Sequence, residues 1–234
     1  EAALWAWETF GGIGARTRRG FGALRRLDGD GYPLPDAANL GKWLDDAVRA
    51  HFPPHGQWPP DIPHLYRKRK FANPSHGDDA AAVWGHLMQK LRDFRQARTG
   101  SRQGRSKWPE PDAIRRLART HAPNHKPEHK VEDKYPRAAF GLPIEFKFKT
   151  ADERLGDPQK TTLEGTANGR MASPLILKPL ACAGGKTVGL AVILQGTNFP
   201  AGGVRLKSKS TPAHPTVEVQ LDQTKSLPEA DLIE

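Results

Sequence analysis

The hydrophobic positions in the first half of the chain recur at helical spacing and predict helices before any strand. Residues 1–10 form the first candidate helix, with Leu4, Trp5 and Trp7 available for packing. A second helix is predicted over about residues 37–51, because Asp36 can cap its first turn. Its apolar face carries Leu40, Trp43, Leu44, Ala47 and Val48.

The clearest helical pattern covers residues 79–98. Its first half should pack through one apolar face, made of Trp84, Leu87, Leu91 and Phe94. Arg95 and Arg98 continue much the same stripe, so the second half should present cations. A flexible basic loop is predicted over residues 99–107, and Pro109 fits the first turn of a further helix. The buried positions expected in that helix are Ile114, Leu117 and Ala118.

From Pro136 onward the pattern changes to short apolar runs separated by turns rich in Gly, Asn and Pro. These runs are typical of β-strands, which we predict over residues 142–149, 171–178, 186–194 and 215–221. A helical part followed by a strand-rich part indicates the α+β class.

Charge adds the first indication of a partner. The 234 residues carry a net charge of +10, and the sequence pI is about 9.9. Residues 1–140 hold 25 Lys and Arg against 16 Asp and Glu, a net charge of +9, whereas residues 141–234 hold 11 against 10. Such a balance favours a polyanionic partner, either nucleic acid or an acidic membrane, bound by the first part of the chain.

Composition limits the compartment and the fold. Only 37% of the residues are hydrophobic, and the 21 prolines and 23 glycines suit a loop-rich surface. No apolar run approaches the roughly eighteen residues of a membrane span, so no membrane contact of that kind is expected. The single cysteine, Cys182, excludes an internal disulfide, suits a cytoplasmic protein and is predicted to be a small buried core residue.

The strongest candidate site is the segment GIGARTRRGFG at residues 12–22. Two Gly-x-Gly pairs enclose a short stretch that carries Arg16, Arg18 and Arg19. Glycine permits positive φ and close backbone approach, and arginine offers a planar charged fork that matches phosphate oxygens. A lone pair would favour an ordinary solvated turn, but two pairs around an arginine cluster predict a phosphate-binding loop. Its shape would depend on Gly12, Gly14, Gly20 and Gly22.

A second basic run lies after a Pro-rich connector that covers residues 51–64. Four cations stand between two aromatic residues, Tyr66 and Phe71, and they are Arg67, Lys68, Arg69 and Lys70. Phosphate contacts combined with base stacking would use this mixture. A solvated charge run explains the segment equally well.

Signals for a metal or a cofactor are weak. His121, His125 and His129 recur every four residues, but Pro123 and Pro127 interrupt the helix that would align them. We therefore expect a solvated basic linker and no zinc site.

The segment at residues 184–187 ends like a nucleotide-binding Walker motif, yet Leu180 occupies the place of its first glycine. A turn into a strand is the better interpretation, and no cofactor is predicted.

Metal-free RNA cleavage is the enzymatic alternative, because imidazole titrates near neutral pH and can act as a general base. The candidate bases are His51, His55, His64 and His76. Nothing in their spacing indicates a paired acid and base.

Three blocks of the sequence, the third made of two segments, together resemble a known family. The glycine-rich loop resembles the signature of the RAMP proteins of CRISPR systems, which follows the second helix of a ferredoxin-like domain. With residues 105–115, 140–144 and 172–180 added, the chain resembles the first-numbered RAMP subunit of the type III-B (Cmr) effector complex. The three blocks are spread over residues 11–180.

The resemblance implies a ferredoxin-like (RRM-like) RAMP fold with a basic helical insertion. Residues 1–32 would end the first ferredoxin-like domain, residues 33–135 would form the basic helical region, and residues 136–234 would supply the strand-rich part of a second RAMP domain. The strands and helix that begin the first domain would then lie on a preceding part of the protein or on another polypeptide.

The function implied is that of a non-catalytic subunit of a type III-B CRISPR ribonucleoprotein in antiviral defence. It would hold the 3′ part of the guide crRNA together with target RNA, and it would contact other RAMP subunits. The alternative within the same superfamily is an endoribonuclease that processes CRISPR repeat RNA, and a scaffold that docks a protein partner is a third possibility. The residues expected on RNA are the loop glycines and arginines, Arg67, Lys68, Arg69, Lys70, Arg95 and Arg98.

Overall fold

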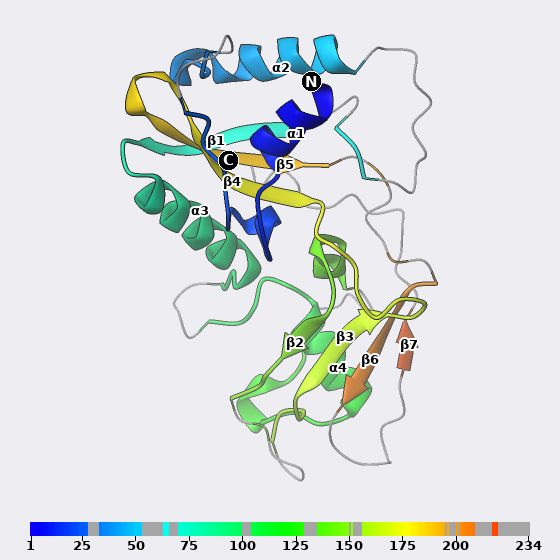
Figure 1. Cartoon of the computed structure of the whole chain (residues 1–234). Helices are drawn as coiled ribbons and strands as arrows, with labels where there is room; N and C mark the ends of the chain where they lie inside the picture. The colour runs from blue at the N-terminus through cyan, green and yellow to red at the C-terminus, as the bar shows by residue number, and fades with distance from the viewer. Residues whose placement is uncertain are drawn as a thin grey trace. The chain divides into compact units, whose positions relative to one another are not determined.

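The computed structural model divides the chain into two compact units, each assembled from distant segments (Figure 1). The first unit contains the described residues within 1–94 and 174–197, and the second contains those within 95–173 and 198–227. The structure describes residues 1–27, 33–52, 63–65, 70–99, 104–128, 135–149, 151, 156–194, 196, 200, 202–208 and 217–219. Of residues 70–76 and 217–219 it describes the backbone.

A three-stranded antiparallel sheet forms the centre of the first unit, in the order β1-β5-β4. The strands are β1 (Lys70–Gly77), β4 (Leu175–Ala181) and β5 (Thr187–Ile193). Strands β4 and β5 form a hairpin around the short turn Ala183–Gly185, in agreement with the turn predicted before Thr187. β1 has a register irregularity between Ala72 and Ser75, where the sequence places Pro74. An edge strand tolerates a proline because its outer N–H groups are not needed for pairing.

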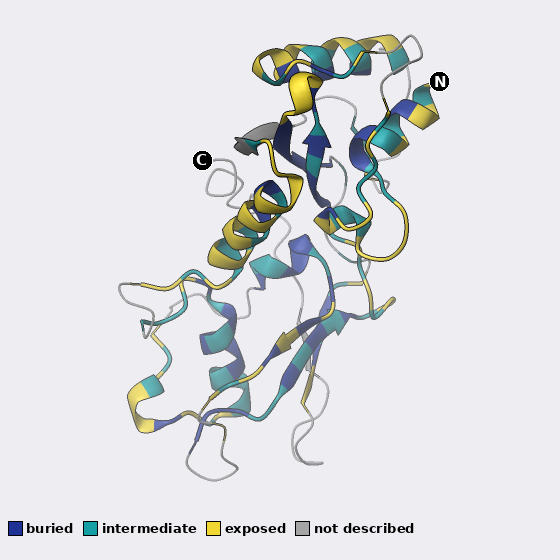
Figure 2. Cartoon of the chain, turned by 60° about the vertical axis from the view of Figure 1, so that its left-hand side comes forward, coloured by how far each residue is buried: buried dark blue, intermediate teal, exposed yellow. Residues whose placement is uncertain are grey.

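Helices cover this sheet on both sides. They are α1 (Ala2–Phe10), α2 (Leu40–His51, preceded by a 3₁₀ turn at Ala37–Asn39) and α3 (Ala80–Arg95). Helices α1 and α2 pack on the face formed by the even-numbered residues of β4 and β5, and Figure 1 shows α3 on the other side of the sheet. Figure 2 shows the buried face of α2 turned toward the sheet and its outer face exposed. The core on this face consists of Trp5, Phe10, Leu40, Leu44, Val48, Ile176, Leu180, Cys182, Val188, Leu190, Val192 and Leu194.

The helices predicted from hydrophobic spacing are confirmed, with two corrections. The helix predicted over residues 79–98 ends at Arg95, so Arg98 lies outside it. Asp36 caps the second predicted helix as expected, since its carboxylate accepts a hydrogen bond from the Ala38 N–H at 3.1 Å.

The buried face of α1 also differs from the one expected. Leu4 is 63% exposed and Trp7 is 45% exposed, while Trp5 and Phe10 are buried. The reason is geometric: residues 4 and 7 share one side of the helix, and only the side that carries residues 5 and 9 faces the sheet.

A buried lysine joins α1 to the sheet. Lys178 lies in the middle of β4 and is 0% exposed. Its Nζ donates to the main-chain oxygens of Glu8 and Gly11, the latter at 3.0 Å, where the last turn of α1 leaves carbonyls without helical partners. Burial lowers the pKa of Lys178 to about 8, against the opposing influence of the Glu8 carboxylate. A cation at this position also complements the negative end of the helix.

The second unit has its own sheet and core. Its four antiparallel strands follow the order β2-β3-β6-β7, and the helix α4 (Glu110–Ala118) belongs to the same unit. The strands are β2 (Ile144–Phe146), β3 (Thr161–Gly165), β6 (Val204–Ser208) and β7 (Val217–Val219). Short 3₁₀ turns occur at Pro123–His125 and Pro136–Phe140. The core contains Ala113, Ile114, Tyr135, Ala138, Leu142, Ile144, Phe146, Leu163, Val204 and Leu206.

The described residues thus form an α+β structure with two small antiparallel sheets, in the class that the sequence predicts. Strands overlap all four predicted ranges, whereas β1, β3 and β6 were not predicted. The basic loop at residues 99–107 is paired at its ends, because the Thr99 N–H donates to Arg105 O and the Lys107 N–H donates to Ala97 O, both at 2.8 Å. Within the described part of the chain, no helix has the length and apolarity of a membrane span.

Replacing Lys178 with methionine should destabilise the protein by about 1–3 kcal/mol, because the carbonyls of Glu8 and Gly11 lose their buried donor. Equilibrium urea denaturation measures the change. The control is Lys42→Met, since Lys42 is exposed and pairs only with Asp46 on α2. Equal stabilities of the two variants would show that the buried contact contributes nothing.

The same variant should reveal a pH dependence of stability. Between a pH of about 8 and 10.5 the folded protein has released the Lys178 proton that the unfolded chain still holds. Stability rises with pH wherever the unfolded state binds more protons. The free energy of unfolding of the wild type should therefore increase with pH relative to that of Lys178→Met across this window. A constant difference would mean that Lys178 titrates normally.

Candidate nucleic-acid interface

The glycine-rich loop leaves α1 through a narrow neck. The Ile13 N–H donates to the Gly22 carbonyl at 2.9 Å, which closes residues 13–22 into a loop. A Cβ on Gly22 would lie 1.9 Å from Ile13 O, and a Cβ on Gly12 would lie 2.7 Å from Gly22 O. Two glycines are thus required here because the two backbone segments lie too close for any side chain.

The far end of the loop packs on β4 and α3. A Cβ on Gly20 would lie 2.9 Å from Trp84 Cδ1 and 3.1 Å from Leu177 O. The Trp84 Nε1 also donates to Arg19 O at 2.8 Å. Position 20 therefore requires glycine for two reasons, namely the close contact with Trp84 and Leu177 and the positive φ of 77°. Trp84, which belongs to α3, holds this end of the loop in place.

Inside the loop, a turn of 3₁₀ helix at Thr17–Arg19 presents the arginines. The Arg19 N–H donates to Arg16 O at 2.8 Å, and Arg16 itself has a left-handed φ of 62°. Gly14 has a φ of 90° with open space around it. A side chain would fit at this position, so glycine is favoured here by the backbone conformation and not by a lack of space.

Positive charge is concentrated on this loop. Arg16 and Arg19 are exposed, and among the described residues their side chains have no hydrogen-bond or ion-pair partner. Arg18 is half-buried, and this burial lowers the pKa of its guanidinium below the ordinary value. Residues 11–27 contain no acidic side chain. Among the described residues, no side chain competes with an anion for the guanidinium groups of Arg16 and Arg19.

Glu8 connects α1 both to β4 and to the segment that follows the loop. Its main-chain oxygen accepts from Lys178, and its carboxylate accepts from Arg26 Nε at 3.0 and 3.2 Å. Arg26 follows the loop in the chain, so the ion pair returns the chain to the helix that it left. The loop is thereby held at a defined place before any ligand arrives.

The other residues predicted on RNA lie outside the described side chains or in the second unit. Lys70 begins β1, of which the backbone is described, and Arg67, Lys68 and Arg69 lie outside the described residues. Arg95 and Arg98 belong to the second unit.

Arg95 and Arg98, the two predicted RNA-binding residues of the second unit, take part in local contacts. Arg95 O accepts from Arg137 Nη1 at 3.0 Å, and Arg98 Nη1 donates to Gly104 O at 2.9 Å. Arg98 thus helps to close its own loop, a use that the helical stripe did not predict.

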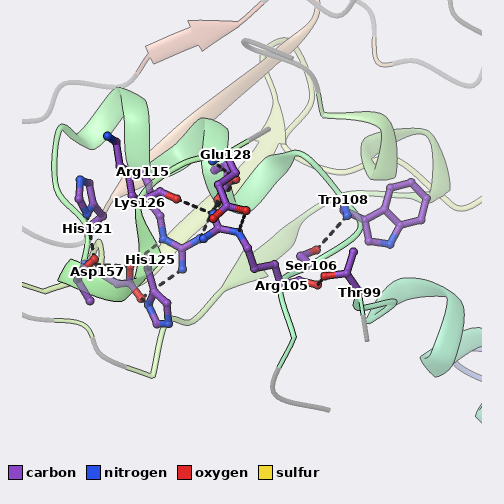
Figure 3. A network of polar contacts seen from close by, with 12 residues as sticks. Thr99, Arg105, Ser106, Trp108, Arg115, His121, His125, Lys126, Glu128 and Asp157 are labelled. Carbon is purple, nitrogen blue, oxygen red and sulfur yellow. Dashed lines mark hydrogen bonds and ion pairs between the residues drawn. The ribbon is translucent and has the colours of Figure 1, made fainter. Parts of the chain in front are cut away.

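Two buried carboxylates organise a network of polar contacts in the second unit (Figure 3). Asp112 accepts from Arg105 Nη2 at 2.9 Å and from Arg115 Nη1 at 3.0 Å. Asp157 accepts from Arg115 Nε at 2.7 Å and from the imidazole Nδ1 of His125. Arg115 therefore bridges the two carboxylates and ties α4 to the segment before β3.

This network corrects the expectation for the histidine-rich segment. His121 and His125 were predicted to lie in a solvated linker, but His125 is anchored to a carboxylate that is 1% exposed, and His129 lies outside the described residues. An oriented imidazole can in principle move a proton. Among the described residues, however, no group of His, Cys, Asp or Glu could hold a metal ion.

The remaining histidine candidates are scattered. His51 ends α2 and stacks near Trp5 at 5.1 Å between ring centroids. His64 forms an isolated β-bridge, His76 lies in β1, and His55 is outside the described residues. Cys182 is buried in the core as predicted, and burial raises the pKa of its thiol to about 11, which suits packing and not nucleophilic chemistry.

Comparison with known proteins bears on the loop directly. Residues 1–25 match the RAMP superfamily. The matched segment contains α1 and the whole loop, including all seven predicted glycines and arginines. The RAMP match supports the assignment at the level of the superfamily and does not extend to a subtype. Searches of curated proteins and of solved structures found no match.

Sequence reasoning missed Lys178, Phe21 and Asp157. A lysine inside an apolar strand is a visible signal, since burial demands a partner, but the partner could not be named. Phe21 stands between two of the loop glycines, and the loop pattern alone does not indicate a role for its ring. For Asp157 the sequence offers no signal, because its partners lie far away along the chain.

The glycines should respond differently to alanine. Gly22→Ala should disrupt the neck and weaken anion binding strongly, because its Cβ would overlap Ile13 O. Gly14→Ala should cost only about 1–2 kcal/mol of backbone strain and preserve the loop. Gly41→Ala on α2 is the control, since its Cβ would meet nothing within 4 Å and should stabilise the helix by about 0.5–1 kcal/mol. Thermal unfolding and heparin retention report both effects; identical behaviour of the two loop variants would contradict the steric account.

Asp157→Asn should destabilise the protein by about 3 kcal/mol or more, because Arg115 loses a buried counter-charge and His125 loses its carboxylate partner. Urea denaturation measures the loss, with the exposed Asp93→Asn as control. RNA affinity of the folded variant should stay at the wild-type value, since the network is structural. Weaker RNA binding at unchanged stability would contradict this role.

Proposed function

We propose that this chain is a non-catalytic RNA-binding subunit of a CRISPR ribonucleoprotein and that its glycine-rich loop grips RNA phosphates. The observation that carries the proposal is the pair of exposed guanidinium groups of Arg16 and Arg19, which have no partner among the described residues, on a loop that packing has already shaped. The RAMP match over residues 1–25 falls on the same segment.

Phosphate is the ligand that best fits the loop. A guanidinium can donate two parallel hydrogen bonds to phosphate oxygens, and such charge-assisted bonds are about twice as strong as neutral ones. Since Lys178, Trp84 and Glu8 already hold the loop, RNA would not have to order it on binding. A loop that is ordered in advance gives up less binding free energy to entropy.

The finer assignment is a subunit of the type III-B (Cmr) complex with a ferredoxin-like RAMP architecture. Its support is the resemblance of the loop, of residues 105–115 and of the blocks at 140–144 and 172–180. In that role the chain would hold the 3′ part of the guide crRNA and target RNA beside other RAMP subunits in the cytoplasm.

One observation favours the endoribonuclease alternative, namely the imidazole of His125 held by the buried carboxylate of Asp157. That carboxylate is also engaged by Arg115 and by the Ala122 N–H at 3.4 Å. Cleavage would need a second acid or base within hydrogen-bond reach of the same phosphate. Incubation with labelled repeat RNA in chelator separates the two functions: cut product that disappears in His125→Ala supports the nuclease, and retention of intact RNA supports the subunit.

Replacing Arg16 and Arg19 together with alanine should weaken binding of single-stranded RNA and flatten its salt dependence. The log–log slope changes by about 0.7 for each phosphate that a cation neutralises, so the slope of the double variant should be smaller by about 1.4. Filter binding across a salt series measures both quantities. Lys42→Ala with Arg49→Ala removes the same charge from exposed positions on α2 and is the matched control. If both double variants behave alike, net charge and not the loop binds RNA.

A further inference from the structure

A groove of about 460 Å³ opens beside the glycine-rich loop in the first unit. The loop lines one side with residues 20–25, the first turn of α3 lines another, and the β4–β5 hairpin completes it. Its most distinctive members are Phe21, Arg25, Trp84 and Lys186. A space of this size accommodates a small organic ring system.

Two aromatic rings form part of the wall. The Phe21 and Trp84 ring centroids are 5.0 Å apart at an interplanar angle of 76°, an edge-to-face contact. Trp84 is itself fixed by the hydrogen bond from its Nε1 to Arg19 O. Phe21 remains 42% exposed although it is packed in this way. The loop therefore holds a phenyl ring in place while a large part of it stays open to solvent.

Charge at the groove favours an anionic occupant. Arg25 is exposed, and among the described residues its side chain has no hydrogen-bond or ion-pair partner. The two nearby acids are engaged: Asp78 pairs with Lys186 at 2.6 Å, and Asp79 accepts from the Ala81 N–H at 2.8 Å at the start of α3. Asp79 does not line the groove, and the charged residues that do are Arg25 and Lys186 against Asp78, which leaves a net charge of +1.

We propose that this groove binds one unstacked base of the RNA held by the loop, with the base on Phe21 and the adjoining phosphate on Arg25. The inference rests on the proposed RNA-binding function and adds a stacking site to the phosphate grip. A base suits the aromatic wall because its π-face stacks on such rings whatever its identity. A phosphate suits Arg25 for the same reason that it suits Arg16 and Arg19. The site should therefore accept any base.

The experiment compares three variants in binding to a short single-stranded RNA across a salt series. Phe21→Ala should weaken binding at least about fivefold without changing the salt slope, because it removes stacking but no charge. Phe21→Trp should restore affinity, since it keeps an aromatic face. Arg25→Ala should lower the slope by about 0.7. Leu4→Ala is the matched control, because Leu4 is an exposed apolar residue of the first unit that does not line the groove.

A second measurement keeps the proposal testable if Phe21→Ala unfolds. Wild-type protein is irradiated with RNA that carries 4-thiouridine, and the cross-linked peptides are identified. Cross-links on Phe21 or Trp84 support the groove. Cross-links found only elsewhere, or wild-type affinity in folded Phe21→Ala, overturn it while leaving the phosphate grip of Arg16 and Arg19 intact. If wild-type protein binds no RNA, the proposed function and the groove both fail.

Discussion

The contact between Lys178 and the end of α1 is the interaction on which the first unit depends. A lysine in the middle of an apolar strand would be costly if it had no partner, and here two main-chain oxygens provide one. Because those oxygens belong to the last turn of α1 and to the first residue after it, the same contact fixes where the helix ends. The glycine-rich loop starts at that point, so its position follows from a contact inside the core.

From there the shape of the loop is set by close packing of the chain against itself. Gly12 and Gly22 meet at the neck, Gly20 lies against Trp84 and β4, and only Gly14 is surrounded by open space. The arginines are therefore carried by a frame that excludes side chains at three positions. This division explains why glycines enclose the arginines in the segment: one type forms the frame, and the other remains available for a ligand.

The sequence predicted the elements whose signals are local. Hydrophobic spacing located α1, α2 and α3, and the apolar runs located β4 and β5. It failed for β1, which contains Pro74 and ends at Gly77, because this strand is specified by its pairing with β5 and not by its own composition. In the site, the loop could be recognised from its glycines and arginines. The partner of Lys178 and the aromatic contact of Phe21 could not be recognised from the sequence, since both partners lie far away in the chain.

The chain order of the first unit has a consequence for synthesis on the ribosome. Strand β1 pairs with β5, so the sheet that contains residue 70 cannot form until residue 193 has been synthesised. Until then the apolar faces of α1 and α2 lack the strands β4 and β5 that cover them in the folded protein. Residues 95–173, which belong to the second unit, are synthesised before those strands. Contacts of such long separation slow folding and leave hydrophobic surface exposed in the nascent chain. The loop that carries the arginines therefore cannot acquire its final support before residue 178 has been synthesised and Lys178 reaches the end of α1.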